Sequence, residues 1–505
     1  MNRTKLLSVL LGTALTLTAC SGSKSGGEST SAAPSSKPKE TPTVTIMMVG
    51  DISYPDDNII NKEIMKRTGV NVKWMFVPVG DFTTKLNTLI ASNDLPDIIH
   101  NQDPKKVKEL ATNKMIVPLD DLLAKYGKNI KENKSDVLKG VNMINGKVYS
   151  IPQARDLGGE SVAIRKDWLD KLGLKVPTNL DEYYTALKAF KEKDPDGNGK
   201  NDTVPLGVTM DYIKTMNHIF GAYGVPFDAA KERGRYIDGK VLPAFLQPGF
   251  LDAIKYYNKL YKEGLMEPDF STIKAIPTYT KLWTGNVGTF NFQPPGTTQN
   301  WITRYTENPK PTFAYTVIKG PNGVGGQTKS YKEDGGPFVT LSANSKNPEA
   351  AMKVMDFLIS DEGDKLTFCG IEGTHYKSVN NQCQYMDPFT DAVKQRNDGV
   401  QVYYGLMYRV NGAELRNFNE LTKQGIQIAR DAQLTDAHLS EIPEVEIAQG
   451  KIMLDIVKEF IAGGIVSKGN LDQEYETYKK KYLDAGGTKW IDQATAIYKK
   501  DNNIK

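Results

Sequence analysis

Histidine and cysteine are scarce in this chain of 505 residues, which contains four histidines and three cysteines. The histidines (His100, His218, His375 and His438) are scattered along the sequence. They give little support for a histidine-ligated metal centre or a Ser–His catalytic site. A nucleophile elbow and a Gly-rich phosphate loop are also absent. These absences argue against enzymes of those classes.

Neither sign of charge dominates the sequence. Lys and Arg number 64 against 60 Asp and Glu, which gives a net charge of +4 with the two signs mixed throughout. This balance offers no electrostatic footprint for nucleic acid. Beyond the first 20 residues, no segment approaches the ~18 consecutive apolar residues that a membrane-spanning helix needs. We therefore expect no nucleic-acid partner and no membrane-spanning segment in the body of the chain.

The N-terminus has the pattern of a secretion signal. Arg3 and Lys5 precede an uncharged apolar run over 6–19 that is too short to span a bilayer. The run closes on Leu-Thr-Ala-Cys, which resembles the lipobox of bacterial lipoproteins, with Cys20 as the residue that accepts the lipid. We predict that 1–19 is a lipoprotein signal peptide and that acyl chains such as palmitate anchor Cys20 to the outer face of a bacterial cell membrane.

The segment that follows Cys20 differs in composition from the rest of the chain. Residues 21–43 are mainly Ser, Gly, Pro, Lys, Glu and Thr, without a large apolar side chain. Such a segment buries too little surface to offset its ordering entropy. We predict that 20–43 is a lipidated, disordered tether, and that the membrane is reached through the lipid anchor only.

The body alternates short apolar strands with amphipathic helices. Strands are predicted at 44–50, 70–77 and 97–100, and helices at 58–68 and 82–91. Strands that alternate with helices indicate right-handed βαβ units around a mainly parallel sheet. The roughly 460 residues after the tether predict two or more domains. The predicted fold class is therefore α/β.

Four motifs in order carry a resemblance to a known family. They are KEIMKRTGV at 62–70, NGKVYSIP at 145–152, IRKDWLDKLGL at 164–174 and GIEGTHY at 370–376. In these motifs the chain resembles the family 1 bacterial extracellular solute-binding proteins, and within that family the large members that bind oligosaccharides.

The resemblance implies a fold, a partner and a function. It implies a two-lobed periplasmic-binding-protein-like fold with crossing hinge segments, with lobe one at 43–153 plus 290–337 and lobe two at 154–289 plus 338–505. It also implies a monomer that captures a carbohydrate, without covalent chemistry, and delivers it to an ABC-type membrane permease.

An acidic loop follows the predicted helix at 181–191. DPDGNGKND at 194–202 places oxygen ligands at loop positions 1, 3, 5 and 9, with glycine at position 6. This spacing is that of an EF-hand-type loop and suits Ca²⁺, and position 7 would contribute its backbone carbonyl. The predicted ligands are Asp194, Asp196, Asn198, Lys200 and Asp202. Pro205 replaces the usual glutamate at position 12, and the alternative is a solvated Asp/Gly turn. We expect a structural calcium ion, which large members of the family also carry.

Cys369 and Cys383 are the other two cysteines, 14 positions apart. Outside the cytoplasm such a pair can form a disulfide that closes this loop. Two buried free thiols are an equally good interpretation. Family members commonly carry an aromatic residue at the position of Cys369.

Ligand-binding residues are expected in loops at the ends of strands, where open α/β sheets bind ligands. Aromatic rings stack on sugar faces, and amide or charged groups bind the hydroxyls. The predicted set is Asp51, Tyr54, Gln102, Gln153, Arg155, Tyr212, Trp283, Phe292, Gln293, Tyr376 and Tyr403.

Two rival functions remain open from the sequence. A binding protein for a peptide or another small polar solute would keep the fold and change the ligand. A surface-anchored glycan-degrading enzyme would need two carboxylates ~5–10 Å apart, and the 60 acidic residues of the chain leave room for such a pair.

Overall fold

The computed structural model describes residues 40–50, 57–78, 80–135, 138, 143–153, 161–227, 232, 234–291, 295–307, 309–328, 337–409 and 411–504. Of residues 101, 102, 300, 301, 303 and 328 it describes the backbone alone. The predicted signal peptide and all but the end of the predicted tether lie outside these residues. The description below concerns the compact unit Pro42–Lys505.

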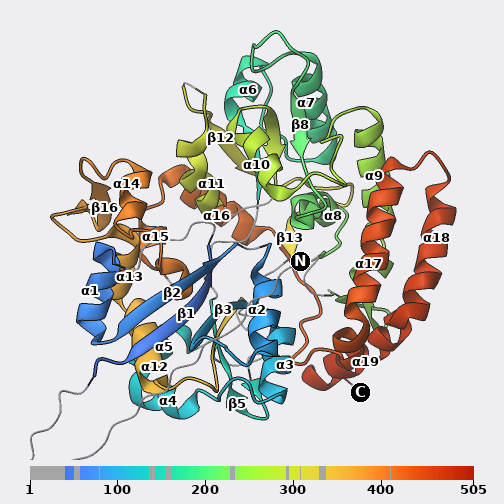
Figure 1. Cartoon of the computed structure of the whole chain (residues 1–505). Helices are drawn as coiled ribbons and strands as arrows, with labels where there is room; N and C mark the ends of the chain where they lie inside the picture. The colour runs from blue at the N-terminus through green and yellow to red at the C-terminus, as the bar shows by residue number, and fades with distance from the viewer. Residues whose placement is uncertain are drawn as a thin grey trace, which may run out of the picture. The chain divides into compact units, whose positions relative to one another are not determined.

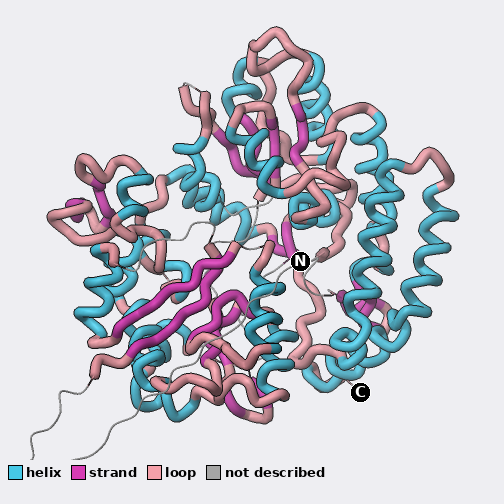
Figure 2. The backbone as a smooth tube through the Cα atoms, viewed as in Figure 1, coloured by secondary structure: helices cyan, strands magenta, loops and turns pink. Residues whose placement is uncertain are grey.

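Five strands form the first sheet, in the order β2-β1-β3-β14-β6. Figure 1 labels β1, β2 and β3 of this sheet, and Figure 2 shows them as magenta strands. The strands are β1 (Thr43–Val49), β2 (Asn71–Val77), β3 (Ile98–Gln102), β6 (Ser150–Pro152) and β14 (Phe338–Leu341). β1 is parallel to β2 and β3, and β14 is antiparallel to both β3 and β6. The second half of β1, residues 46–49, is an unbroken apolar run because both of its faces are covered: Ile46 and Met47 are fully buried in different core clusters.

Helices cover both faces of this sheet. On one face pack α1 (Ile59–Thr68) and α12 (Pro348–Leu358), and on the other pack α2 (Phe82–Ala91) and α3 (Pro104–Thr112). α1 begins after Asn58, whose side chain accepts a hydrogen bond from the Asn61 amide, and it ends at Gly69. We call this sheet and its helices lobe one.

Four strands form the second sheet, in the order β12-β7-β11-β8. They are β7 (Val162–Arg165), β8 (Val204–Gly207), β11 (Val287–Phe290) and β12 (Phe313–Thr316). β7 is antiparallel to β11 and β12, and β8 is parallel to β11. The largest core cluster of the chain lies on this side and includes apolar residues of α9 (Phe250–Lys262) and α17 (Glu444–Val466). We call this sheet and its helices lobe two.

The remaining elements complete the two lobes. The other helices are α4 (Asp120–Tyr126), α5 (Lys128–Lys134), α6 (Lys166–Lys171), α7 (Leu180–Glu192), α8 (Asn217–Ala222), α10 (Ala275–Trp283), α11 (Pro295–Trp301), α13 (Asp361–Cys369), α14 (Ala392–Asn397), α15 (Ala413–Arg416), α16 (Glu420–Asp431), α18 (Leu471–Tyr482) and α19 (Thr488–Asp501). Short strand pairs are β4 (Met143–Ile144) with β5 (Lys147–Val148), β9 (Gly234–Ile237) with β10 (Lys240–Pro243), β13 (Gln327–Thr328) with β17 (Gln433–Leu434), and β15 (Tyr376–Val379) with β16 (Gln382–Tyr385).

The strand pairings correct part of the predicted division into lobes. β12 lies in 290–337, which was predicted to return to lobe one, but it pairs with β7 in lobe two. β14 lies at the start of 338–505, which was predicted for lobe two, but it pairs with β3 and β6 in lobe one. Both sheets consist of short buried apolar strands, so composition alone could not assign these strands to a lobe.

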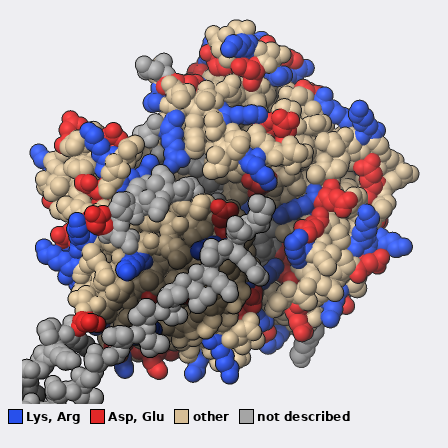
Figure 3. Space-filling model, viewed as in Figure 1, with Lys and Arg blue, Asp and Glu red and all other residues tan. Residues whose placement is uncertain are grey.

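Between the elements that the structure describes, the chain passes from one lobe to the other at three places. The first connection runs from β6 to β7, the second from β13 to β14, and the third from α15 to α16. None of the helices within the described ranges is both long enough and apolar enough to cross a membrane. On the face of the molecule in Figure 3, basic and acidic side chains are interspersed, as expected from their near-equal numbers.

Candidate functional site

The chain connects one edge of the first sheet to one edge of the second sheet, and in each sheet this is the edge where most strands have their carboxyl ends. In lobe one, β1, β2, β3 and β6 all have their carboxyl ends at the edge where β14 begins, because β14 is antiparallel to β3 and β6. In lobe two, β8, β11 and β12 end where β7 begins. The β6–β7 connection runs from the first of these edges to the second. Open α/β sheets bind ligands at their carboxyl edges, so this is where we locate the candidate site.

Two polar side chains of lobe one converge on a single carbonyl group at this edge. Gln153, directly after β6, donates from Nε2 to the carbonyl oxygens of Gly405 at 2.6 Å and Leu406 at 2.9 Å. His100 in β3 accepts the Val49 amide at Nδ1 (3.3 Å) and lies 3.1 Å from the Gly405 oxygen through Nε2. These contacts assign the proton to Nε2.

His100 is held in its neutral form. Burial lowers its pKa to about 4, although the hydrogen bond to the Gly405 carbonyl acts in the opposite direction. A neutral ring can accept at one nitrogen and donate at the other, as the contacts require. Gly405 lies close to β1, because a Cβ there would lie 2.9 Å from the terminal methyl of Met48 and would displace it. The 404–406 turn is therefore fixed against the carboxyl end of the first sheet.

Three tyrosines in and beside this turn have different environments. Tyr403 is fully buried, packs 4.5 Å from the Trp74 ring and accepts a hydrogen bond from Asn58 at its hydroxyl group. Tyr404 and Tyr408 are half-buried and lie edge to face with ring centroids 5.5 Å apart. The predicted ligand residue Tyr403 is thus a core residue, and its neighbours present the partly exposed rings.

The corresponding edge of lobe two carries a chain of polar side chains. Asn291, directly after β11, accepts a hydrogen bond from Gln327 Nε2 at 2.7 Å and donates to the Lys214 carbonyl at 3.2 Å. Ser161 directly precedes β7 and is buried. Ser161 Oγ and Gln327 Oε1 have no hydrogen-bond partner within the part of the chain that the structure describes.

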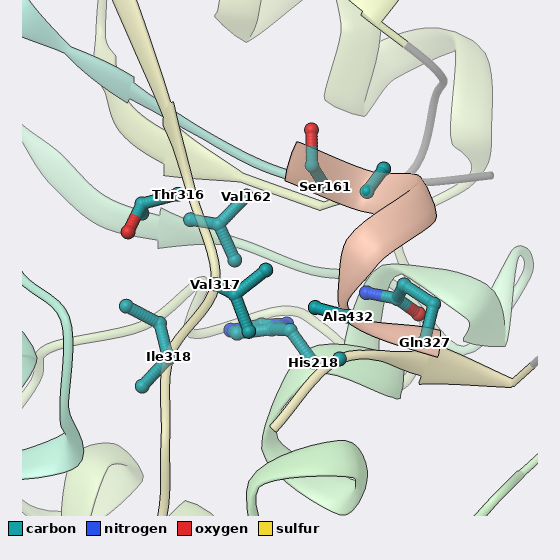
Figure 4. A pocket seen from close by; sticks show the side chains of 10 residues that line it. Ser161, Val162, His218, Thr316, Val317, Ile318, Gln327 and Ala432 are labelled. Carbon is teal, nitrogen blue, oxygen red and sulfur yellow. The ribbon is translucent and has the colours of Figure 1, made fainter. Parts of the chain in front are cut away.

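A small cavity lies beside these groups (Figure 4). Its volume is about 10 Å³, which is room for one water molecule. Its lining residues are Ser161, Val162, His218, Thr316, Val317, Ile318, Gly326, Gln327, Ala429 and Ala432. Burial lowers the pKa of His218 to about 3, so this imidazole is neutral. The edge of lobe two thus offers neutral amide, hydroxyl and imidazole groups.

The structure brings few of the predicted ligand residues together. Asp51, Tyr54, Arg155, Phe292 and Gln293 lie outside the described residues, and Gln102 is described by its backbone, at the carboxyl end of β3. Gln153 lies at the edge and contacts the turn that follows Tyr403.

Three other predicted ligand residues pack against the protein itself. Tyr376 is 5% exposed and packs with Phe368 and Cys369, which makes it a core residue. Tyr212 and Trp283 are half-buried against the cluster around β11, and the Arg304 guanidinium lies 4.8 Å from the Trp283 ring. The sequence prediction missed His100, Ser161, Asn291 and Gln327 as site residues. Ser161 and Asn291 could have been found, since each is a polar residue directly adjoining a buried strand.

The acidic loop between α7 and β8 gathers its oxygen ligands. Asn198 Nδ2 donates to Asp196 Oδ2 at 2.8 Å and to Asp202 Oδ1 at 3.0 Å. Asp194 accepts the Gly199 amide at 3.0 Å. A hydrogen bond from Asp196 and the loop amides lower the pKa of Asp194, whereas burial and the Asp194 carboxylate raise the pKa of Asp196.

The geometry of this loop is not yet that of a metal site. Within the described ranges, no three His, Cys, Asp or Glu side chains form a group that could hold a metal ion. The donor set nevertheless suits Ca²⁺, because it consists of hard carboxylate and amide oxygens. The Asn198 amide group lies between two carboxylates, and exchange of its oxygen and nitrogen positions would turn its oxygen toward them.

The comparison with known proteins identifies the family. The profile described as "Bacterial extracellular solute-binding protein" matches residues 52–365, more than half of the chain. The chain belongs to this family. The predicted family and the two-lobed α/β fold are thereby confirmed.

Two relatives from Bacillus subtilis (strain 168) match nearly the whole chain. This solute-binding protein is 27% identical to Lipoprotein LipO, with 91% of this chain and 92% of that protein covered. It is also 27% identical to the polygalacturonan/rhamnogalacturonan-binding protein YtcQ, with 99% of both chains covered.

Two solved structures share the fold. The EF-hand mutant of the Streptococcus pneumoniae ABC-transporter substrate-binding protein FusA, in complex with fructo-nystose, is 21% identical with a TM-score of 0.70, covering 92% of this chain and 100% of that chain. The alginate-binding protein AlgQ2 without calcium ion is 21% identical with a TM-score of 0.69, covering 91% and 98%.

Proposed function

We propose that this solute-binding protein captures an oligosaccharide between its two lobes and delivers it to an ABC-type importer. Two observations carry the proposal: half-buried Tyr404 and Tyr408 lie at the ligand edge of lobe one, and buried amide and hydroxyl groups lie at the corresponding edge of lobe two. Aromatic faces and hydroxyl-binding amides are what a protein needs to hold sugars. The polygalacturonan/rhamnogalacturonan-binding relative YtcQ and the complex of FusA with fructo-nystose support this ligand class.

The expected mechanism is lobe closure around the ligand without chemistry on it. The three connections between the lobes would act as hinges, and the ligand favours the closed form by its higher affinity for that form. Membership of a family of binding proteins supports binding rather than hydrolysis. The closed form would then dock on a membrane permease, as a monomer, and no nucleic acid is involved.

A lipid anchor at Cys20 is part of the proposal. The pattern Leu-Thr-Ala-Cys at 17–20 supports it, as does the name of the relative LipO, a lipoprotein. The protein would be held at the extracytoplasmic face of the membrane, which fits the extracellular designation of its family.

A structural calcium ion in the 194–202 loop is also proposed. Asp194, Asp196, Asn198 and Asp202 would hold it through side-chain oxygens, and Lys200 through its backbone carbonyl. The ion would neutralise the carboxylates and fix the connection between α7 and β8. Two structures with the same fold support the proposal, the EF-hand mutant of FusA and AlgQ2 without calcium ion.

Ligand binding can be tested by thermal unfolding of residues 42–505 with a panel of neutral and acidic oligosaccharides. A ligand that binds the folded state raises the unfolding temperature with the logarithm of its concentration. We expect a saturable increase with one class of oligosaccharide, recovered intact. Binding of peptides alone would contradict the carbohydrate proposal, and cleavage of a sugar would establish an enzyme instead.

A further inference from the structure

An ion pair joins the two lobes, and neither of its residues belongs to the three connections between them. Lys105 Nζ, in the first turn of α3, lies 3.0 Å from Glu446 Oε1, in the first turn of α17. α3 belongs to lobe one, where Val107 and Leu110 pack with Phe338 of β14. α17 packs in the core of lobe two. The pairs Arg67–Glu362 and Arg165–Glu307, by contrast, each lie inside a single lobe.

Glu446 is held firmly by lobe two. Its side chain is 4% exposed, and its Oε2 accepts a hydrogen bond of 2.8 Å from the indole nitrogen of fully buried Trp490. Its Oε1 also accepts the Glu232 amide at 3.4 Å. The carboxylate therefore has a fixed position before Lys105 approaches it.

A second carboxyl group lies next to Glu446. Glu232 accepts a hydrogen bond of 3.0 Å from the Tyr482 hydroxyl. Burial and then the Glu446 charge raise the pKa of Glu232 to about 8, while Lys105 acts in the opposite direction. This part of lobe two thus carries a buried negative charge, and Lys105 of lobe one supplies a cation next to it.

Separation of the lobes would remove that cation. A buried carboxylate without its partner is costly, because the hydration lost on burial is no longer compensated. Lys105 is 34% exposed and can be rehydrated readily, whereas Glu446 remains enclosed by Trp490 and Glu232. The pair consequently favours the arrangement in which α3 and α17 meet. α3 begins two residues after the carboxyl end of β3, so this contact is connected to the edge where we locate the ligand.

We propose that the arrangement in which α3 and α17 meet is the closed one, and that Lys105 and Glu446 form an interlobe latch that stabilises it and thereby raises the affinity of this protein for its solute. The effect on solute affinity rests on the proposed function, whereas the stabilising effect of the ion pair on the lobe arrangement does not. If the binding-competent arrangement is populated to a smaller fraction, the apparent dissociation constant increases by the inverse of that fraction. Removal of the latch is expected to weaken ligand binding about fivefold or more.

The test compares Lys105→Met with Lys106→Met. Lys106 is a matched control because it is the next residue on α3, carries the same charge and pairs with Glu109 of its own helix. Spin labels at exposed Lys108 and Ala448 would report the distance between α3 and α17 in the ligand-free protein. We expect longer and broader distances for Lys105→Met and unchanged distances for Lys106→Met. Salt at 1 M should broaden the wild-type distances and leave those of Lys105→Met unchanged.

A second variant, on the other partner of the ion pair, tests whether the effect of Lys105→Met comes from the lost charge pair and not from a local change in α3. Glu446→Gln keeps an acceptor for Trp490 and removes the charge, so it should shift the distances in the same direction as Lys105→Met. If both variants retain the wild-type distance distribution, the latch is refuted. Because these distances are measured without ligand, failure of every oligosaccharide to bind would refute the proposed function and leave this result intact.

Discussion

Gln153 donates a hydrogen bond from Nε2 to the carbonyl oxygen of Gly405 at 2.6 Å, across 252 positions of sequence. His100 of β3 contacts the same oxygen from a different strand. Two strands of one sheet thus hold the turn that carries Tyr404. In this protein the site geometry depends on buried polar contacts as well as on the exposed residues that would touch a ligand.

Replacement of Gln153 by leucine should affect both stability and binding. It leaves the buried carbonyls of Gly405 and Leu406 without this donor, at a cost of about 1–3 kcal/mol in unfolding free energy. It should also weaken oligosaccharide affinity, because the turn is no longer fixed. Gln247→Leu is the matched control: Gln247 is equally buried and donates to the Leu242 carbonyl in lobe two. Denaturant titration and calorimetry should show lost stability in both variants and lost affinity in Gln153→Leu alone.

His100 should make the protein sensitive to mild acid. Its pKa is about 4 in the folded state and about 6.5 in the unfolded chain. The unfolded chain takes up a proton first, so this contribution to stability is complete above pH 6.5 and is lost as the pH falls toward 4, by about 3 kcal/mol in total. His100→Gln cannot titrate, and its unfolding free energy should fall less steeply over this range. Parallel pH profiles of the two proteins would contradict the assignment.

Tyr404 and Tyr408 should contribute to sugar binding through their rings. Replacement of either tyrosine by leucine removes an aromatic face worth about 0.5–1.5 kcal/mol, which corresponds to a roughly twofold to tenfold weaker affinity. Tyr403→Phe is the control, since it removes the hydroxyl group that Asn58 contacts inside the core. It should lower stability by about 1 kcal/mol and leave the affinity unchanged. Equal affinities for all three variants would place the sugar elsewhere.

The local structure of lobe one follows closely from the sequence. The helix predicted at 82–91 is α2, with the same bounds, and the helix predicted at 58–68 is α1, which begins one residue later. The spacing of apolar residues along each helix, and Gly69 at the end of α1, lie within the helices or next to them, so a short stretch of sequence is enough to predict these elements. Pairing between distant strands is not local: β14 joins β3 across more than 230 positions, and nothing in the four residues of β14 distinguishes the two sheets.

The candidate site was harder to predict for the same reason. Tyr403 and Tyr404 are adjacent and chemically identical, yet Tyr403 is buried against Trp74 and Tyr404 is partly exposed. The direction of each side chain is set by the turn, which Gln153 and His100 fix from far away in the sequence. Cys369 and Cys383 show the opposite case. Spacing left two interpretations open, and the structure joins them in a disulfide with the Cα atoms 5.9 Å apart.

Calcium should stabilise lobe two if the proposed loop holds it. At a calcium concentration one hundred times the dissociation constant, the stabilisation would be about 2.7 kcal/mol, so a chelator should lower the unfolding temperature by several degrees. Asp196→Asn combined with Asp202→Asn should abolish this response. Asp238→Asn, in the turn between β9 and β10, should retain it. A wild-type protein that unfolds at the same temperature with and without chelator would contradict the calcium proposal.

The disulfide between Cys369 and Cys383 should stabilise the region next to the third connection. It ties α13 to β16, and the Cys383 amide donates to Asn417 Oδ1 at 2.8 Å. Asn417 in turn accepts a hydrogen bond from Gln299 of α11 in lobe two through its carbonyl oxygen. A disulfide that closes a loop of this length stabilises the folded protein by about 3 kcal/mol, because it lowers the conformational entropy of the unfolded chain.

Replacement of both cysteines by serine should therefore lower the unfolding free energy by about 3 kcal/mol. A reductant should destabilise the wild-type protein by a similar amount and have no effect on the double variant, which controls for other actions of the reductant. Because Asn417 links the disulfide to lobe two, the double variant should also exchange the amide hydrogens of 417–420 faster. Unchanged exchange there with the full loss of stability would show that the disulfide acts on the unfolded chain alone.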